Sequence, residues 1–268
     1  MRLNAHRSFI PAALVLLAAS STVPARAETE EDWCREDGWD SKPRYCEVRE
    51  SSFQPGSELT VDARPNGGIK VRSTDGTEVR LRAKVVATAD SEAEARDLAR
   101  EVRIETGGMV RAVGPASGRR RVFWVSFRLE VPRGVRVSLH ADNGGISLRD
   151  FSGTAELHTV NGGLHISRAA GDVQGETVNG GVHVDLSGTR WQGEGLNVRT
   201  TNGGLHVTLP SDYNARLEMG TVNGGVHSDI PPTTKRRYTG GRIDTDLGQG
   251  GPPVRIETTN GGIHLSQR

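Results

Sequence analysis

Histidine is the residue type whose spacing in this sequence most clearly suggests chemistry. Five of the eight histidines lie four residues after the asparagine of an Asn-Gly-Gly tripeptide: His165, His183, His206, His227 and His264. Imidazoles can bind Zn²⁺ or Cu²⁺, and they titrate near pH ~6.5, so such a row could hold metal or respond to pH. A specific metal site needs three or four converging ligands, whereas a linear row offers mostly pairs. The simplest interpretation is an exposed row copied by repeat duplication, with metal binding or pH response as an alternative.

Charged residues near the tripeptides raise a second alternative, a carbohydrate-active β-helix enzyme. Asp142, Arg149, Asp150 and Asp185 could lie along an outer groove. Acid and base catalysis requires a defined separation between paired carboxyl groups, and nothing in the sequence brings these residues together. The motifs G-x-x-x-x-G-K-[ST], H-E-x-x-H and G-x-S-x-G are also absent. We therefore expect no enzymatic activity and no cofactor.

The first residues are typical of an export signal. Arg2 and Arg7 precede an apolar stretch, and Ala25-Arg26-Ala27 fits the pattern cleaved by signal peptidase, so residues 1–27 are predicted to be a signal peptide. No later segment approaches the roughly 20 apolar residues of a membrane-spanning helix. We expect an exported protein that is periplasmic, exposed on the outer surface or secreted.

Cys34 and Cys46 are the only cysteines. They lack the C-x-x-C spacing of metal or redox sites, and export would place them in an oxidising compartment. The pair therefore predicts a disulfide, and closing a loop of this length contributes roughly 3 kcal/mol in the chain-entropy model.

An internal repeat determines the expected architecture. Asn-Gly-Gly begins at Asn66, Asn143, Asn161, Asn179, Asn202, Asn223 and Asn260. Apolar residues or threonine occupy the positions six, four and two before most of these asparagines, and apolar residues resume three and five residues after several of them. This period of two predicts a strand with one buried face on each side of the tripeptide. Each repeat is therefore a strand, a corner and a second strand.

Stacked coils of this kind form a β-solenoid, and a set of β-hairpins is the alternative, because Asn-Gly also favours hairpin turns. Low aromatic content (4%) and 34 glycines also favour narrow coils over a wide core. We expect the glycines to accept positive φ at the corners, and the asparagines to form a ladder. The threonines two residues before the asparagines should point inward. Because Pro65 precedes Asn66 and the register differs there, that corner need not stack with the others.

The remaining segments divide the chain. We expect a disulfide-closed segment at 28–57, irregular strands and one amphipathic helix near residues 91–102 within 58–134, and the repeat solenoid at 135–268. The interval before Asn260 contains Pro231-Pro232 and a basic triplet from Lys235, and predicts a protruding loop. The last coil ends close to the C-terminus, so we expect an unpaired strand edge near Leu265 that could support self-association.

The sequence resembles the bacterial "putative adhesin" family of β-strand repeat domains, DUF4097. The likeness rests on the alternating strands from Leu59, the helix at Ser91–Val102, the turn Val131-Pro132-Arg133-Gly134-Val135 and the Asn-Gly-Gly frame. It implies a β-solenoid in an exported or envelope-associated protein, linked in some members to envelope stress, with no defined catalytic residues.

Together these features predict an all-β, non-catalytic scaffold or adhesin-like domain of the bacterial envelope. The expected partner is an envelope or surface component, either protein or polysaccharide. The net charge of +1, with no basic face interleaved with aromatics, argues against a nucleic-acid partner.

Overall fold

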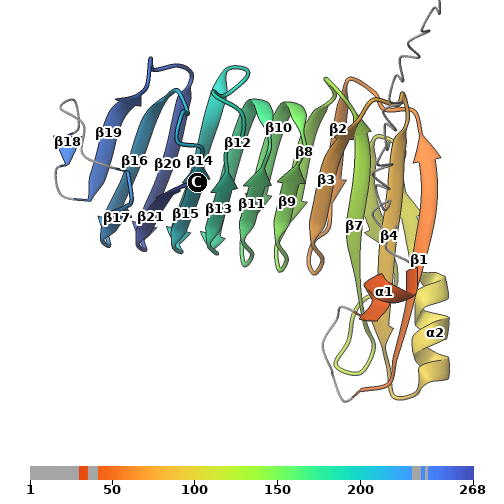
Figure 1. Ribbon diagram of the computed structural model, residues 1–268. Coiled ribbons are helices and arrows are strands. Elements are labelled where there is room, and N and C mark those ends of the chain that lie inside the picture. The colour runs from red at the N-terminus through yellow and green to blue at the C-terminus, as the bar shows by residue number, and fades with distance from the viewer. Residues whose placement is uncertain (1–29, 36–41, 231–236, 239–240) are drawn as a thin grey trace, which may run out of the picture.

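The computed structural model describes residues 30–35, 42–230, 237–238 and 241–268, and it has two long β-sheets that face each other along one axis (Figure 1). Residues 1–29, which include the predicted signal peptide, lie outside the described part of the chain. Within the described residues the fold is all-β apart from two helices, α1 (Glu30–Arg35) and α2 (Glu92–Glu101).

Sheet A contains, in spatial order, β1 (Arg44–Phe53), β4 (Val79–Thr88), β7 (Val122–Pro132), β3 (Ile69–Thr74), β9 (Ile146–Arg149), β11 (Leu164–Ser167), β13 (Val182–Asp185), β15 (Leu205–Leu209), β21 (Ile263–Gln267) and β17 (Val226–Ser228). Sheet B contains, in spatial order, β18 (Arg237–Tyr238), β19 (Arg242–Leu247), β16 (Ala215–Asn223), β20 (Pro253–Asn260), β14 (Gly195–Asn202), β12 (Ala170–Asn179), β10 (Ser152–Thr159), β8 (Arg136–Ala141), β2 (Glu58–Asp62), β6 (Met109–Val113) and β5 (Arg103–Glu105).

Each coil of the solenoid consists of one strand of sheet B, an Asn-Gly-Gly corner and one strand of sheet A. Neighbouring coils pair in parallel, as β10 does with β12 and β11 with β13. Hairpins would pair consecutive strands antiparallel. The parallel pairing therefore confirms the solenoid and excludes the hairpin alternative.

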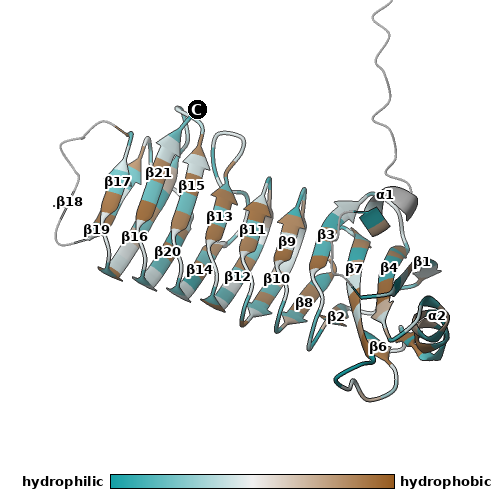
Figure 2. Cartoon of the chain, turned by 90° about the horizontal axis from the view of Figure 1, so that it is seen from below, coloured by the Kyte–Doolittle hydropathy of each residue, from teal (hydrophilic) through white to brown (hydrophobic). Residues whose placement is uncertain are grey.

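The core is a narrow layer between the sheets, filled mainly by aliphatic side chains. In the coil of β10 and β11, Ala155, Leu157, Leu164 and Ile166 are all at most 3% exposed. Figure 2 shows apolar bands recurring on successive strands. This arrangement follows from the period-two pattern, because alternate side chains of a strand point to opposite faces.

The coils do not stack in the order of the sequence. After β15 the chain forms β16 and β17, turns back through the antiparallel strands β18 and β19, and then inserts β20 and β21 between the two preceding coils. The chain therefore ends within the stack (Figure 1).

This insertion shows that the expected unpaired edge near Leu265 is wrong. Strand β21 pairs with β15 on one side and with β17 on the other, and Leu265 is fully buried. The insertion also explains the interval of 37 residues before Asn260, since the chain must reach the end of the stack and return. Residues 231–236, which include Pro231-Pro232 and most of the basic triplet, lie outside the described residues.

A second non-sequential junction lies at the N-terminal end. Strands β2 and β3 pair with β8 and β9. Sheet A is extended beyond β3 by β7, which runs parallel to β3, and then by β4 and β1 in antiparallel order; β4 and β7 come from the chain between β3 and β8, and β1 precedes β2. Helix α2 packs against β1 and β4, and the Ser91 hydroxyl accepts a bond from the Glu94 backbone N–H at its N-terminus, as the sequence predicts. A disulfide between Cys34 and Cys46, with Cα atoms 5.9 Å apart, joins α1 to β1.

The first glycine of six of the seven corners is required by close approach between coils. A methyl group added there would lie 2.0–2.2 Å from the carbonyl oxygen of the equivalent glycine in the adjacent coil, at Gly144, Gly162, Gly180, Gly203, Gly224 and Gly261. None of these six glycines has a positive φ. The expectation that these corners need glycine for positive φ is therefore wrong, and steric contact between neighbouring backbones is the cause.

Asparagine side chains form a continuous ladder along the corners. Each Nδ2 donates to the Oδ1 of the adjacent asparagine at 2.8–3.0 Å, in the spatial order Asn66, Asn143, Asn161, Asn179, Asn202, Asn260, Asn223. The Asn66 corner, whose stacking the sequence left open, does stack on that of Asn143, because β3 pairs with β9 directly after it.

Threonine hydroxyls complete the corners from inside. Thr159, Thr177, Thr200, Thr221 and Thr258 are at most 8% exposed. Each donates to the carbonyl of a corner glycine in the adjacent coil at 2.7–2.9 Å. Buried polar groups are thus satisfied across the junction between coils.

Candidate functional site

The outer face of sheet A carries the most regular exposed chemistry of the described chain. One imidazole occupies the same outward position on each of β11, β13, β15, β21 and β17, because each follows an inward residue of its strand, which is buried on the first four strands and partly buried on β17. The strand register places these rings side by side, in the spatial order His165, His183, His206, His264, His227. We call these five rings the imidazole row.

The spacing of the rings follows the spacing of the strands, which is about 4.8 Å in any β-sheet. Ring centroids lie 6.2 Å apart for His165 and His183, 4.9 Å for His183 and His206, 5.9 Å for His206 and His264, and 5.0 Å for His264 and His227. The chain inversion near the C-terminus exchanges the order of the last two rings.

The surroundings of the row disfavour the protonated imidazole at two positions. Partial burial, followed by the positive charge of Arg149 and the neighbouring His183, lowers the pKa of His165. Partial burial, followed by the neighbours His183 and His264, lowers the pKa of His206. These two rings are therefore neutral at neutral pH, and each neutral ring offers one hydrogen-bond donor and one acceptor.

The ring geometry does not assemble a metal site. The planes of His183 and His206 are only 7° from parallel, so their nitrogen lone pairs run side by side and do not converge on one point. Among residues 30–35, 42–230, 237–238 and 241–268, no group of three histidine, cysteine or acidic side chains is placed to hold a metal ion. Binding of metal by the row stays a prediction.

The fold and the repeat can now be compared with known proteins. A model of the family described as Toastrack DUF4097 matches residues 52–266. The chain belongs to this family. The match includes the imidazole row, the corners, α2, β4 and β7, and it agrees with the resemblance seen in the sequence; most of β1 lies before it. No curated protein matches the chain.

Several solved structures are similar to this Toastrack chain. A "putative cell adhesion protein" from Clostridium sporogenes ATCC 15579 is 13% identical, with 84% of this chain and 100% of that chain covered and a TM-score of 0.45. A "putative adhesin" from Bacteroides fragilis NCTC 9343 is 9% identical, with 84% and 97% covered and a TM-score of 0.37. A "putative lipid binding protein" from Parabacteroides distasonis ATCC 8503 is 10% identical, with 82% and 96% covered and a TM-score of 0.32.

Two of the three carboxylates considered for a carbohydrate-active enzyme, Asp150 and Asp185, are held in ion pairs with arginines. Asp150 accepts two hydrogen bonds from Arg168, at 2.5 and 2.8 Å, and Asp185 accepts one from Arg268 at 2.5 Å. The bond from Arg168 lowers the pKa of Asp150, which disfavours the protonated form that a general acid needs. Asp142 precedes the Asn143 corner, whereas Asp150 follows the far end of β9, so strand β9 separates them.

Two further histidines lie on the outer face of sheet B. His140 and His158 are register partners on β8 and β10, with ring centroids 6.4 Å apart. The Ser138 hydroxyl lies 3.0 Å from Nε2 of His140, and partial burial is the main cause that lowers the pKa of His140. Strand β12 continues this column with Glu176, so the imidazoles do not extend along sheet B as they do along sheet A.

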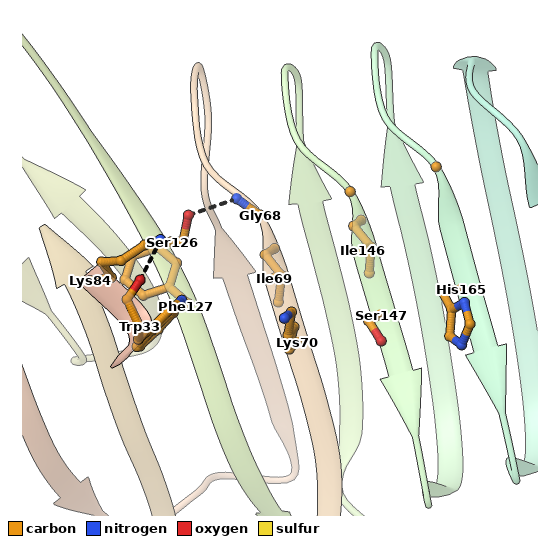
Figure 3. Close-up of a pocket in the computed structure, with 12 residues that line it drawn as sticks. Trp33, Gly68, Ile69, Lys70, Lys84, Ser126, Phe127, Ile146, Ser147 and His165 are labelled. Carbon is orange, nitrogen blue, oxygen red and sulfur yellow. Dashed lines mark hydrogen bonds between the residues drawn. The ribbon is translucent and has the colours of Figure 1, made fainter. Parts of the chain in front are cut away.

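The sequence reasoning missed a basic groove at the N-terminal end of the imidazole row. It is a hollow of about 310 Å³ whose polar lining includes Lys70, Lys84, Ser126, Ser147 and His165. Figure 3 shows that these side chains come from strands distant in sequence, with Trp33 of α1 at one side. We refer to this hollow as the basic groove. No spacing motif links its residues, and the pairing of the neighbouring strands β4, β7, β3, β9 and β11 brings them together.

Trp33 fixes one wall of the basic groove. Its ring is 3% exposed, and the guanidinium carbon of Arg128 lies 3.9 Å from the ring centroid. Its backbone carbonyl accepts a bond of 3.4 Å from Nζ of Lys84. The adjacent Cys34–Cys46 disulfide ties α1 to β1 and so holds this tryptophan over the basic side chains.

No helix among the described residues has the length and apolar character needed to cross a bilayer.

Proposed function

We propose that this Toastrack chain is an exported, non-catalytic scaffold of the bacterial envelope that binds a surface component through the outer face of sheet A. One observation carries the proposal: the exposed imidazoles are spread one per strand along a flat face and do not converge on a point. Catalysis requires groups that converge on one reacting bond. An extended row instead suits an extended ligand or surface.

The proposal includes export and processing. Residues 1–27 would act as a signal peptide, and the mature chain would begin at Glu28. The Cys34–Cys46 disulfide supports this, because such bonds form and persist in oxidising compartments. The mature chain would consist of a disulfide-closed segment (28–57), an irregular region (58–134) and the repeat solenoid (135–268).

Cell fractionation tests the location. The full chain should appear in the envelope fraction or the medium, and a variant lacking residues 2–27 should stay with a cytosolic marker. Recovery of the full chain in the cytosol would contradict export. The non-catalytic part of the proposal is tested by incubating the purified protein with acidic and neutral polysaccharides, where new reducing ends would contradict it.

A second candidate function is a metal-binding or pH-responsive imidazole row. The parallel rings of His183 and His206, 4.9 Å apart, are the observation that favours the pH response, because two protonated rings at this distance would repel each other. Calorimetry with Zn²⁺ tests metal binding: a heat that disappears in the double variant His183→Ala/His206→Ala would support it, and an unchanged heat would remove the row as the site.

A further inference from the structure

The two outer faces of the solenoid differ in charge, although the chain as a whole has a net charge of only +1. Outward positions on the solenoid strands of sheet A include Lys70, Arg72 and Arg149, with Asp185 as the acidic residue. Strands β2, β8, β10, β12, β14, β16, β19 and β20 of sheet B carry nine acids at outward positions, against five arginines. The acids are Glu58, Asp62, Glu156, Asp172, Glu176, Glu218, Asp244, Asp246 and Glu257, and the arginines are Arg136, Arg199, Arg216, Arg242 and Arg255. Sheet A therefore presents the face that attracts anions.

The basic side chains of sheet A are concentrated at one end of the imidazole row. The register pairs Arg82 with Arg128, Arg128 with Lys70, and Arg72 with Arg149. Four neighbouring strands, β4, β7, β3 and β9, thus carry positive charge at adjacent outward positions. Like charges at this spacing repel one another unless an anion lies between them.

Two of these basic side chains are available for a ligand. Lys70 and Arg149 are exposed, and neither makes an ion pair with any residue that the structure describes. By contrast, Glu130 contacts both Arg72 and Arg80, and Glu50 lies 2.9 Å from Arg82. Lys70 and Arg149 lie on the neighbouring strands β3 and β9, on the side of the basic groove nearest the imidazole row.

Groups that form hydrogen bonds continue from this basic end along the whole face. Ser147 and then the imidazole row extend away from Lys70, one per strand (Figure 3). A parallel line of shorter polar groups includes Asp185, Thr208 and Ser266, whereas Ser167 in the same line is buried. Imidazoles and hydroxyls both donate and accept, so they match the hydroxyl groups of a sugar.

The same face lacks the features that other ligands need. Among the described residues, the only large apolar side chain that is fully exposed is Val222, and it belongs to β16 of sheet B. Trp33 is buried and stacked on Arg128, so it cannot stack on a nucleic-acid base. Trp124, at an outward position of β7, is half-buried. The solenoid strands of sheet A, which carry Lys70, Arg149 and the imidazole row, thus offer no exposed apolar patch for lipid chains and no phenylalanine, tyrosine or tryptophan to stack on bases.

We infer that the outer face of sheet A docks a linear glycan that carries carboxylate groups, with its acidic groups at Lys70 and Arg149 and its hydroxyls along the imidazole row. This inference rests on the proposed binding role of this face and names the ligand class. The glycan would lie across the strands, parallel to the long axis of the solenoid.

Binding of polygalacturonate, a linear glycan with one carboxylate per sugar, tests the inference. Calorimetry on the purified protein should show binding that weakens as salt rises, because salt screens exposed charges. The double variant Lys70→Gln/Arg149→Gln should bind at least about tenfold more weakly, which corresponds to about 1.4 kcal/mol. The matched control, Arg199→Gln/Arg242→Gln, removes the same charge from the outer face of sheet B and should stay within about twofold of wild type.

Several outcomes would overturn the inference. No binding of polygalacturonate by the wild type, or equal loss in the two double variants, would remove this face as the site. Equal binding of neutral dextran would show that charge is not used. Tighter binding of polyphosphate or of single-stranded DNA would replace the glycan with another polyanion. Association of the protein with itself at low salt, abolished by Lys70→Gln/Arg149→Gln, would assign the face to a second copy.

These outcomes are separate from those that test the proposed function. If the protein is exported and non-catalytic but does not bind polygalacturonate, the scaffold proposal stands and only the proposed ligand class is refuted. If the protein stays in the cytosol, the proposed envelope role is refuted, whichever polymer the protein binds.

Discussion

At the Asn-Gly-Gly corners every side chain contacts the next coil, whereas in the imidazole row every ring lies on the outer face. The side-chain amide of Asn179 makes two hydrogen bonds, Gly180 leaves no room for a methyl group, and Thr177 is fully buried. His183, on the same coil, is exposed and makes ring contacts only. The corners and the imidazole row repeat with the same period, but they therefore differ in how much they contribute to the stability of the folded chain.

The difference shows that repetition does not by itself identify a stabilising contact. A residue contributes strongly when its removal or enlargement disturbs a buried junction between coils. A ring on the outer face contributes little to folding and is free to contact a ligand. The following four changes test this contrast, in order of decreasing expected effect.

Gly180→Ala should cause the largest loss. The new methyl group would lie 2.1 Å from the carbonyl oxygen of Gly162, so the two coils would have to separate. We expect unfolding in urea to show a loss of about 3 kcal/mol or more, at the upper end for overpacked sites. In Gly181→Ala, the control, the nearest atom is 3.4 Å away, and the loss should be under about 1 kcal/mol. Equal losses would refute close approach as the reason for the glycine.

Thr177→Val should have the next largest effect. Valine keeps the shape of threonine but removes the 2.7 Å bond to the Gly162 carbonyl, leaving a buried acceptor without this donor. We expect a loss of about 1–2 kcal/mol in urea unfolding. Thr201→Val changes an exposed threonine and should lie within about 0.5 kcal/mol of wild type. If the two variants matched, the inward hydroxyl would have no role in holding the coils together.

Replacement of asparagines in the ladder should show an effect that depends on position. Asn179→Ala removes two side-chain bonds of 2.9 Å, whereas Asn223→Ala, at the end of the ladder, removes one of 2.8 Å. We expect a loss of about 1 kcal/mol for the first and about half of that for the second, since these amides are exposed. Thermal unfolding of both variants provides the measurement, and a larger loss at Asn223 would contradict the ladder.

The imidazole row should affect stability least, and only at acidic pH. The pKa values of His165 and His206 are lower in the folded chain than their ordinary value, so the unfolded chain binds these protons first. Stability should be unaffected by these groups above about pH 6.5 and should fall as the pH drops below that value. The variant His165→Gln/His206→Gln should match wild type at pH 7.5 and show a shallower fall in melting temperature down to pH 5.

His140 has the same direction of pKa shift, so some of the slope should remain in that variant. Above pH 5 the carboxylates with lowered pKa values, Asp62 and Asp150, are still ionised and do not contribute. An unchanged slope in the double histidine variant would show that the row has no coupling to folding.

Much of each coil was predictable from local pattern. The alternation before and after each tripeptide identified the strands, their buried faces and the inward threonines, because a strand places alternate residues on opposite faces wherever it lies. The helix at Glu92–Glu101 was likewise predicted from its cap and its apolar spacing. The outward position of the five histidines followed from the same alternation.

The order of the coils was decided only by the tertiary structure. Corners with the same residues can stack in any order, so the tripeptides do not specify that Asn260 lies between Asn202 and Asn223, or that Asn66 meets Asn143. The reason why glycine is required at the corners could not be predicted from the sequence either, because the close approach involves backbone atoms of another coil. The basic groove also depends on pairing between β3, β7 and β9, which are far apart in the chain. Short-range periodicity thus determined which face of each strand is buried, and long-range strand pairing decided which side chains meet on it.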